Sequence, residues 1–334
     1  MTLLTSSILA TEPLFDGVLA YFAPNALLHP ETGLLRAFSY IARAASHQLD
    51  AANRIPIMAS GAWFLSTGIM QLLAKTVLQK RAFLKTKLFN AVLLSIVFLR
   101  AAFSSDPTSM LSPAMTGLKA GLQIGNILWV VSDMIRYFSA TKDNVPRTKL
   151  QPNQVMLLTI HLMHGISSAI IMMGRPEMFV GGEGWGLWRK MSLEQNAIDD
   201  ISRFASKLGG AFYLTSAYSI LDILMFDRSV ERFAWWNTQA VITFALHSFM
   251  FLRAALTGGN EMPFKRMSLF NAFLVFLSLK AGPTLFGEVR NKFQGEKEKK
   301  MTTTSTTTTT KSGKTEGTSI PGLSDEGIHP KKSL

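Results

Sequence analysis

The stretch from Ile55 to Ala74, IPIMASGAWFLSTGIMQLLA, decides the fold class of this chain. Its 20 residues carry no formal charge, and about 20 apolar residues are the length at which an α-helix crosses the hydrocarbon core of a bilayer. Two more stretches, 155–174 and 233–252, have the same length and also lack charged residues. One such segment suits the core of a soluble protein, but several would leave apolar surface exposed on every side. We therefore expect an all-α, polytopic membrane helix bundle.

Further segments qualify as membrane spans if one or two charges are allowed within each. The first of them is the weakest candidate, because it contains Glu12 and Asp16. Backbone groups in lipid need hydrogen-bond partners within their own segment, so every span should be helical. The expected number of spans is seven without the first segment and eight with it. The expected spans lie near residues 3–23, 55–74, 88–105, 111–132, 155–174, 208–226, 233–252 and 267–287.

The sequence contains signs of an internal duplication. Three pairs of similar segments follow one another in the same order: 21–27 with 173–179, 54–66 with 203–215, and 98–102 with 251–255. Both members of the last pair read FLRAA, and the three offsets, 152, 149 and 153 residues, nearly agree. Collinear matches of this kind predict a tandem repeat. We expect repeat A at 1–150 and repeat B at 151–290, each with four spans and related by an axis along the membrane normal.

The last segment, 291–334, lacks periodic apolar positions and predicts a disordered tail. It ends in HPKKSL, with Lys331 and Lys332 at the fourth and third positions from the end. This ending resembles the di-lysine retrieval signal of membrane proteins of the endoplasmic reticulum. The resemblance implies an endoplasmic reticulum membrane protein with a cytosolic carboxyl end, whose KKSL ending is bound by coat machinery.

The charge pattern argues against nucleic acid as a partner, although the net charge is +12. Basic residues flank the apolar segments instead of lining one face, and the densest group lies between Lys75 and Lys87. Between two spans, such a group is expected at the anionic headgroups of the cytosolic leaflet. The expected partners are membrane lipids and other membrane proteins.

Polar residues within the spans are the candidates for a functional site. Lys119, Gln123 and Asn126 follow the spacing i, i+4, i+7 and therefore share one helical face. Such a stripe could line an aqueous cavity, since ionisable residues at membrane depth are costly and often functional. The alternative is that Lys119 ends a shorter span and extends its ammonium to the membrane surface.

Histidines and two arginines complete the candidate residues. His161 and His164 lie on one helical face, and His247 lies in another span that could approach them. Packing and interhelical hydrogen bonds are favoured over metal binding or a proton relay, because the span of His161 contains no carboxylate. Arg100 and Arg253, one in each FLRAA, are expected at the membrane interface rather than in a buried functional role.

No catalytic residue, metal site or cofactor is predicted. Cysteine is absent, which excludes thiolate chemistry, and the sequence lacks nucleophile-elbow, zinc-protease and phosphate-loop motifs. Three hypotheses remain open. The favoured one is a non-enzymatic endoplasmic reticulum protein that binds lipids or membrane partners. The alternative is a transporter or channel with pseudo-symmetric halves, and the third is a lipid-modifying enzyme centred on His161 and His164.

Overall fold

The fold is all-helical, as the sequence predicts. The computed structural model describes residues 3–24, 51–74, 77–104, 111–140, 149–176, 178, 200–226, 228–257 and 261–285. Within these ranges the chain forms eight α-helices: α1 (Leu3–Phe22), α3 (Ala51–Leu73), α4 (Val77–Ala102), α5 (Pro113–Ala140), α6 (Pro152–Gly174), α9 (Asp200–Met225), α10 (Val230–Thr257) and α11 (Glu261–Ala281). Each expected span overlaps one of these helices, including the first, which contains Glu12 and Asp16.

One helix is much longer than expected. The sequence predicts a span that begins near residue 88, whereas α4 already begins at Val77. The additional turns contain most of the basic group that was expected at the lipid headgroups. This difference matters because Lys85 and Lys87 thereby become part of a helix that packs inside the bundle.

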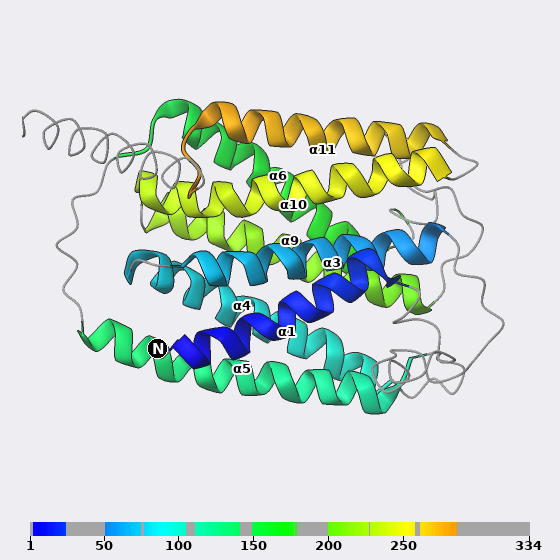
Figure 1. Cartoon of the computed structure of the whole chain (residues 1–334), viewed down its shortest axis with the longest axis horizontal. Coiled ribbons are helices and arrows are strands. Elements are labelled where there is room, and N and C mark those ends of the chain that lie inside the picture. The colour runs from blue at the N-terminus through cyan, green and yellow to red at the C-terminus, as the bar shows by residue number, and fades with distance from the viewer. Residues whose placement is uncertain are drawn as a thin grey trace, which may run out of the picture. The chain divides into compact units, whose positions relative to one another are not determined.

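Successive helices run in alternating directions and pack as neighbouring pairs (Figure 1). Helix α1 packs along α3, α4 along α5, α6 along α9, and α10 along α11. The inner helices α3 and α4 each contact both α9 and α10. The helices of the expected repeat A therefore meet those of the expected repeat B through α3, α4, α9 and α10.

Local hydrogen bonds define where several helices begin. The Ser112 hydroxyl accepts from the Met115 backbone N–H ahead of α5, and the Ser229 hydroxyl accepts from the Arg232 N–H at the start of α10, both at 3.3 Å. Such hydroxyls satisfy backbone donors that have no partner within the helix. Helix α6 begins at Pro152, whose fixed φ suits the first helical position.

Five of the described helices are long and apolar enough to cross a membrane. They are the segments Arg54–Leu73 of α3, Lys80–Ala102 of α4, Pro152–Gly174 of α6, Arg203–Met225 of α9 and Val230–Leu256 of α10. Helices α1, α5 and α11 do not meet this criterion within the described residues. Each of these three helices carries several charged residues, such as Glu12 and Asp16 in α1.

The outer surface of the bundle is apolar where helices face away from their neighbours. In α6, Met156, Met163 and Ile170 are 62%, 67% and 66% exposed and recur every seven residues on one face. Helix α5 likewise exposes Leu128 and Ile135 while it buries polar side chains on its opposite face. An exposed apolar face of this extent suits contact with lipid.

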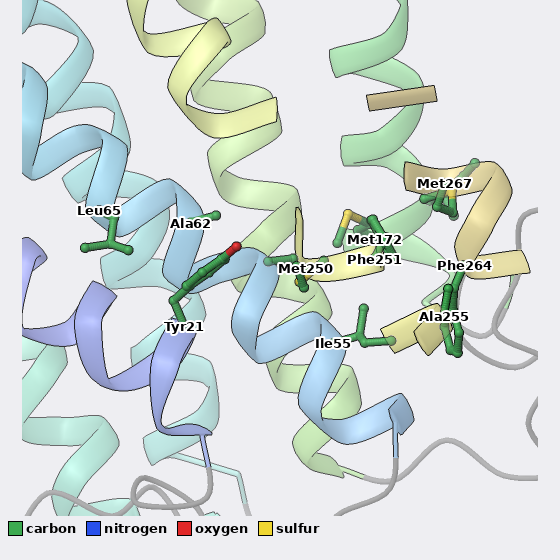
Figure 2. Packing of buried hydrophobic residues seen from close by; sticks show 12 residues of the cluster. Tyr21, Ile55, Ala62, Leu65, Met172, Met250, Phe251, Ala255, Phe264 and Met267 are labelled. Atoms are coloured by element: carbon green, nitrogen blue, oxygen red, sulfur yellow. The ribbon is translucent and has the colours of Figure 1, made fainter. Parts of the chain in front are cut away.

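A hydrophobic cluster joins α1 and α3 to α6, α10 and α11 (Figure 2). Tyr21 of α1 points toward α10, and its hydroxyl donates to the carbonyl oxygen of Leu246 at 2.7 Å. Helices α1 and α3 approach closely, because a Cβ added at Gly61 would lie 2.6 Å from the Tyr21 backbone nitrogen. Gly61 thus allows a close helix contact.

Candidate functional site in the polar interior

An ion pair between α1 and α5 lies inside the bundle. The Lys119 Nζ atom is 2.5 Å from Asp16 Oδ2, and the two side chains are only 10% and 12% exposed. This contact argues against the alternative in which Lys119 extends to the membrane surface, because its ammonium has a buried carboxylate partner. The neutralising charge comes from another helix, which the surroundings of Lys119 in the sequence do not reveal.

The stripe of Lys119, Gln123 and Asn126 faces α1, as their spacing predicts. Gln123 Nε2 donates to Glu12 Oε1 at 2.9 Å, and Asn126 Nδ2 donates to Glu12 Oε2 at 3.0 Å. Both carboxylate oxygens of Glu12 therefore accept an amide hydrogen bond. All three residues of the stripe are buried. The stripe binds protein carboxylates in this structure and does not face open solvent.

Lys87 of α4 is a buried cation that the sequence analysis placed at the headgroups. Lys87 is 4% exposed, and its ammonium interacts electrostatically with the carboxylates of Glu12 and Asp16. We call Glu12, Asp16, Lys87 and Lys119 the charged cluster. It contains two carboxylates and two ammonium groups, so its formal charge is zero. The neutrality explains how four ionisable groups are accommodated within the bundle, since unpaired buried charges are strongly disfavoured.

A small cavity lies between the inner helices α3, α4, α9 and α10. Its volume is about 20 Å³, which is room for about one water molecule. Lys87 and Asn90 line it from α4, Trp63 and Thr67 from α3, and Thr215 from α9, while α10 contributes Trp235 and Gln239. Lys87 therefore belongs both to the charged cluster and to the wall of this central cavity.

Trp63, in the wall of the central cavity, carries an unpaired donor. The residue is 3% exposed, and its indole Nε1 has no hydrogen-bond acceptor among the described residues. Most buried polar groups in proteins are hydrogen-bonded, so such an exception calls for a ligand, a water or another specific explanation.

A second cavity, of about 40 Å³, adjoins Asp16. Asp16 and Ser60 are the polar residues of its wall, and apolar side chains such as Phe64 and Phe204 make up most of the remainder. Asp16 thus lies between this cavity and Lys119. The charged cluster consequently borders one cavity through Lys87 and another through Asp16.

A second buried ion-pair network connects α4 with α9 and α10. Asp222 of α9 accepts from Lys85 Nζ at 3.0 Å and also forms an ion pair with Arg232 of α10. Nearby, the hydroxyls of Thr86 and Ser219 lie 2.9 Å apart and share a hydrogen bond. These contacts couple a helix of the expected repeat A to two helices of the expected repeat B.

The three candidate histidines gather around one aromatic ring. The rings of His161, His164 and His247 lie 5.2, 6.0 and 6.1 Å from the centre of Phe244. Among the described residues, no group of three or more potential metal ligands has an arrangement that could hold a metal ion. The structure thus brings His247 near His161 and His164, as the sequence left open, within an aromatic environment.

The hydrogen bonds of the histidines involve backbone and hydroxyl groups. His247 Nε2 donates to the Ala59 carbonyl oxygen at 3.1 Å, while His161 Nε2 lies 3.4 Å from the Ser278 hydroxyl. His164 Nδ1 is 3.4 Å from the Ser168 hydroxyl, one turn along α6. Two of these three contacts join different helices, in the manner expected of packing and interhelical hydrogen bonding.

The remaining candidates lie outside this interior. Arg100 and Arg253 are exposed, Arg100 in the last turn of α4 and Arg253 near the carboxyl end of α10. Their interfacial role stays a prediction. The tail at 291–334, with Lys331 and Lys332, lies outside the described residues.

A sequence signal for the charged cluster was present but incomplete. Glu12 and Asp16 are spaced i, i+4, as are Lys119 and Gln123. Helix α1 therefore carries an acidic face, and α5 carries a face with a cation and an amide. This complementarity could have predicted that α1 and α5 face each other. Lys87 gave no such signal, because it stands next to other basic residues at the start of an apolar run.

Comparisons of the chain with protein-family models, with curated proteins and with solved structures found no match. The class of protein is defined by the structure itself. Five long apolar helices, outer faces of exposed apolar side chains and an interior that contains ion pairs identify a multi-pass helical membrane protein.

Proposed function

We propose that this protein is a membrane transporter for a small hydrophilic solute. The observation that carries the proposal is the charged cluster, in which Glu12, Asp16, Lys87 and Lys119 are buried or half-buried between helices. Ionisable residues within membrane helices are costly and mark solute or ion pathways more often than structural contacts. Because of this cluster, we favour a transport function over the lipid- or protein-binding function that the sequence alone favours.

The central cavity supports the same proposal by its position. It lies where α3 and α4 meet α9 and α10, which is where the two expected repeats come together. Substrate sites of many transporters lie at such a repeat interface, and alternating access results when one repeat moves against the other. We infer a tandem duplication, supported by the corresponding pairings α1–α3 with α6–α9 and α4–α5 with α10–α11.

We further propose that all eight described helices cross the membrane. Helices α1 and α5 carry charged residues that pair with each other inside the bundle. Asp16 and Lys119 neutralise each other, and Glu12 accepts two amide hydrogen bonds, so their cost at membrane depth is reduced. The apolar residues of α5 face outward while its polar residues face α1.

Flux through reconstituted protein tests the transport proposal. Purified protein in liposomes is adsorbed to a solid-supported membrane, and currents are recorded after concentration jumps of chloride, acetate, potassium or protons. We expect transient currents with at least one of these probes. The double variant Asp16→Asn/Lys119→Met removes both charges together, so it leaves neither of the two without its partner, and it should reduce the current at least tenfold.

Asp200→Asn provides the matched control, because Asp200 lies 3.9 Å from Arg203 and both side chains of this pair are partly exposed. This variant should retain the wild-type current. Currents from wild-type protein that equal those of empty liposomes for every probe would contradict transport of these solutes. An unchanged current in the double variant would show that the charged cluster is not part of the transport pathway.

The proposed location is the endoplasmic reticulum, with a cytosolic carboxyl end. It rests on the resemblance of KKSL to a di-lysine signal, which coat machinery would bind. We expect a chain that carries a tag in an internal loop to be retained in the endoplasmic reticulum. Lys331→Ser/Lys332→Ser should leave that compartment, as followed by fluorescence microscopy in cells. If both chains reach the same other membrane, the location and the signal are both wrong.

A further inference from the structure

The wall of the central cavity includes two residues that carry hydrogen-bond donors, Trp63 and Lys87. The Trp63 N–H has no acceptor among the described residues. The Lys87 ammonium forms no ion pair within 4 Å in the same part of the chain, although Glu12 and Asp16 lie within electrostatic reach. Asp16 pairs directly with Lys119, and Glu12 accepts from two amides. The lining of the cavity thus includes a residue with an unpaired neutral donor, Trp63, and a residue with a buried ammonium group, Lys87.

Hydroxyl groups in the wall of the cavity are already engaged. Thr67 Oγ1 donates to the Trp63 carbonyl oxygen at 2.8 Å, and Thr215 Oγ1 donates to Ala211 and accepts from Asn90. Ser216 Oγ accepts from the indole nitrogen of Trp236. These hydroxyls therefore have partners within the protein, whereas the indole N–H of Trp63 has none. A ligand that offers an acceptor atom matches this arrangement.

The Trp63 indole is held in place by its aromatic neighbours. Its ring stacks on Phe212 with centroids 6.0 Å apart and an interplanar angle of 1°. It also makes edge contacts with Tyr213, Phe244 and His247 at centroid distances of 5.4, 6.4 and 6.2 Å. A donor fixed in this way loses little conformational freedom when it binds a ligand, so it is preorganised for recognition.

We propose that the central cavity is the substrate site and that it binds a small monovalent anion through Trp63 Nε1–H and Lys87. The proposal rests on the transport function inferred above and names the class of its substrate. The positive charge of Lys87 disfavours a cation at the same position. The volume of about 20 Å³ restricts the closed cavity to an ion or group about the size of a water molecule.

Ligand-dependent thermal stability of detergent-purified protein tests this site. Sodium chloride or sodium fluoride replaces sodium gluconate at constant ionic strength, because gluconate is too large for the cavity. A ligand that binds only the folded protein raises the midpoint of unfolding with its concentration. We expect a saturable rise for the wild type with at least one of the two anions. Trp63→Phe, which removes the N–H and keeps the aromatic ring, should weaken the apparent affinity about tenfold or more.

Trp236→Phe is the matched control. Trp236 is also 3% exposed, but it does not line the cavity, and its indole nitrogen donates to Ser216. This variant should keep the wild-type anion affinity. The double variant Glu12→Gln/Lys87→Met preserves the net charge of the cluster and should lose the anion response. It remains informative if Trp63→Phe does not fold.

The outcomes separate the site from the transport proposal. A wild-type protein that is insensitive to both anions, or equal affinities for wild type and Trp63→Phe, would overturn the site. The assay needs no flux, so anion binding with the expected variant pattern would uphold the site even if reconstituted protein moved no solute. In that case only the transport proposal would fail.

Discussion

Asp222→Asn is expected to lower the free energy of unfolding by about 3–5 kcal/mol. The carboxylate of Asp222 pairs with Lys85 and with Arg232, whose side chain is only 6% exposed. Loss of the negative charge leaves a buried guanidinium and an ammonium close together without the carboxylate between them. Removing one partner of a buried ion pair is far more costly than the net contribution of the intact pair, because the remaining charge is desolvated without compensation.

The measurement is unfolding of the purified protein by titration of mixed micelles with sodium dodecyl sulfate, followed by circular dichroism. Asp200→Asn removes the same charge from the same helix at an exposed ion pair, whose loss should cost less than about 1 kcal/mol. Equal midpoints for Asp222→Asn and Asp200→Asn would show that the network between α4, α9 and α10 does not stabilise the bundle.

Lys119→Met is expected to cost a similar amount, about 3–5 kcal/mol, because Asp16 would then be buried without its ion-pair partner. The double variant Asp16→Asn/Lys119→Met should recover most of this loss, since an apolar methionine and a neutral amide are accommodated inside the bundle at lower cost. The two residues touch, so their effects on stability should be strongly non-additive.

The same detergent titration, applied to the wild type, both single variants and the double variant, yields the coupling free energy between Asp16 and Lys119. A coupling below about 0.5 kcal/mol would match independent sites and contradict a direct ion pair. It would also remove the support that this pair lends to α1 and α5 as membrane spans. A large coupling joined with unchanged flux in the double variant would assign the pair a structural role.

Much of the secondary structure was predictable because each helix is specified by a continuous stretch of its own sequence. The helices α3, α6 and α10 were predictable because each contains a stretch of 20 residues without formal charge. The face shared by Lys119, Gln123 and Asn126 was predictable too, since a helical period relates these positions whatever lies opposite. The start of α4 at Val77 was not predictable in this way, because the basic residues near Lys80 are typical of a loop between two spans.

The partners of the polar residues could not be derived in the same way. Nothing next to Lys119 in the sequence indicates that Asp16, 103 positions away, neutralises it. The burial of Lys87 and the unpaired N–H of Trp63 likewise depend on helices that are distant in sequence. The three histidines were predictable as candidates. Only the packing of separate helices against one another places their rings around Phe244.

The sequence by itself determined the helical class of this protein, the approximate ranges of its helices and the polar face of α5. The tertiary structure alone decided which charges are neutralised, where the central cavity lies and which helices join the two expected repeats. The physical reason is that the apolar length and periodicity of a helix are properties of one segment. The free energy of a buried charge depends instead on its distance to an opposite charge, which only the packing of separate segments sets.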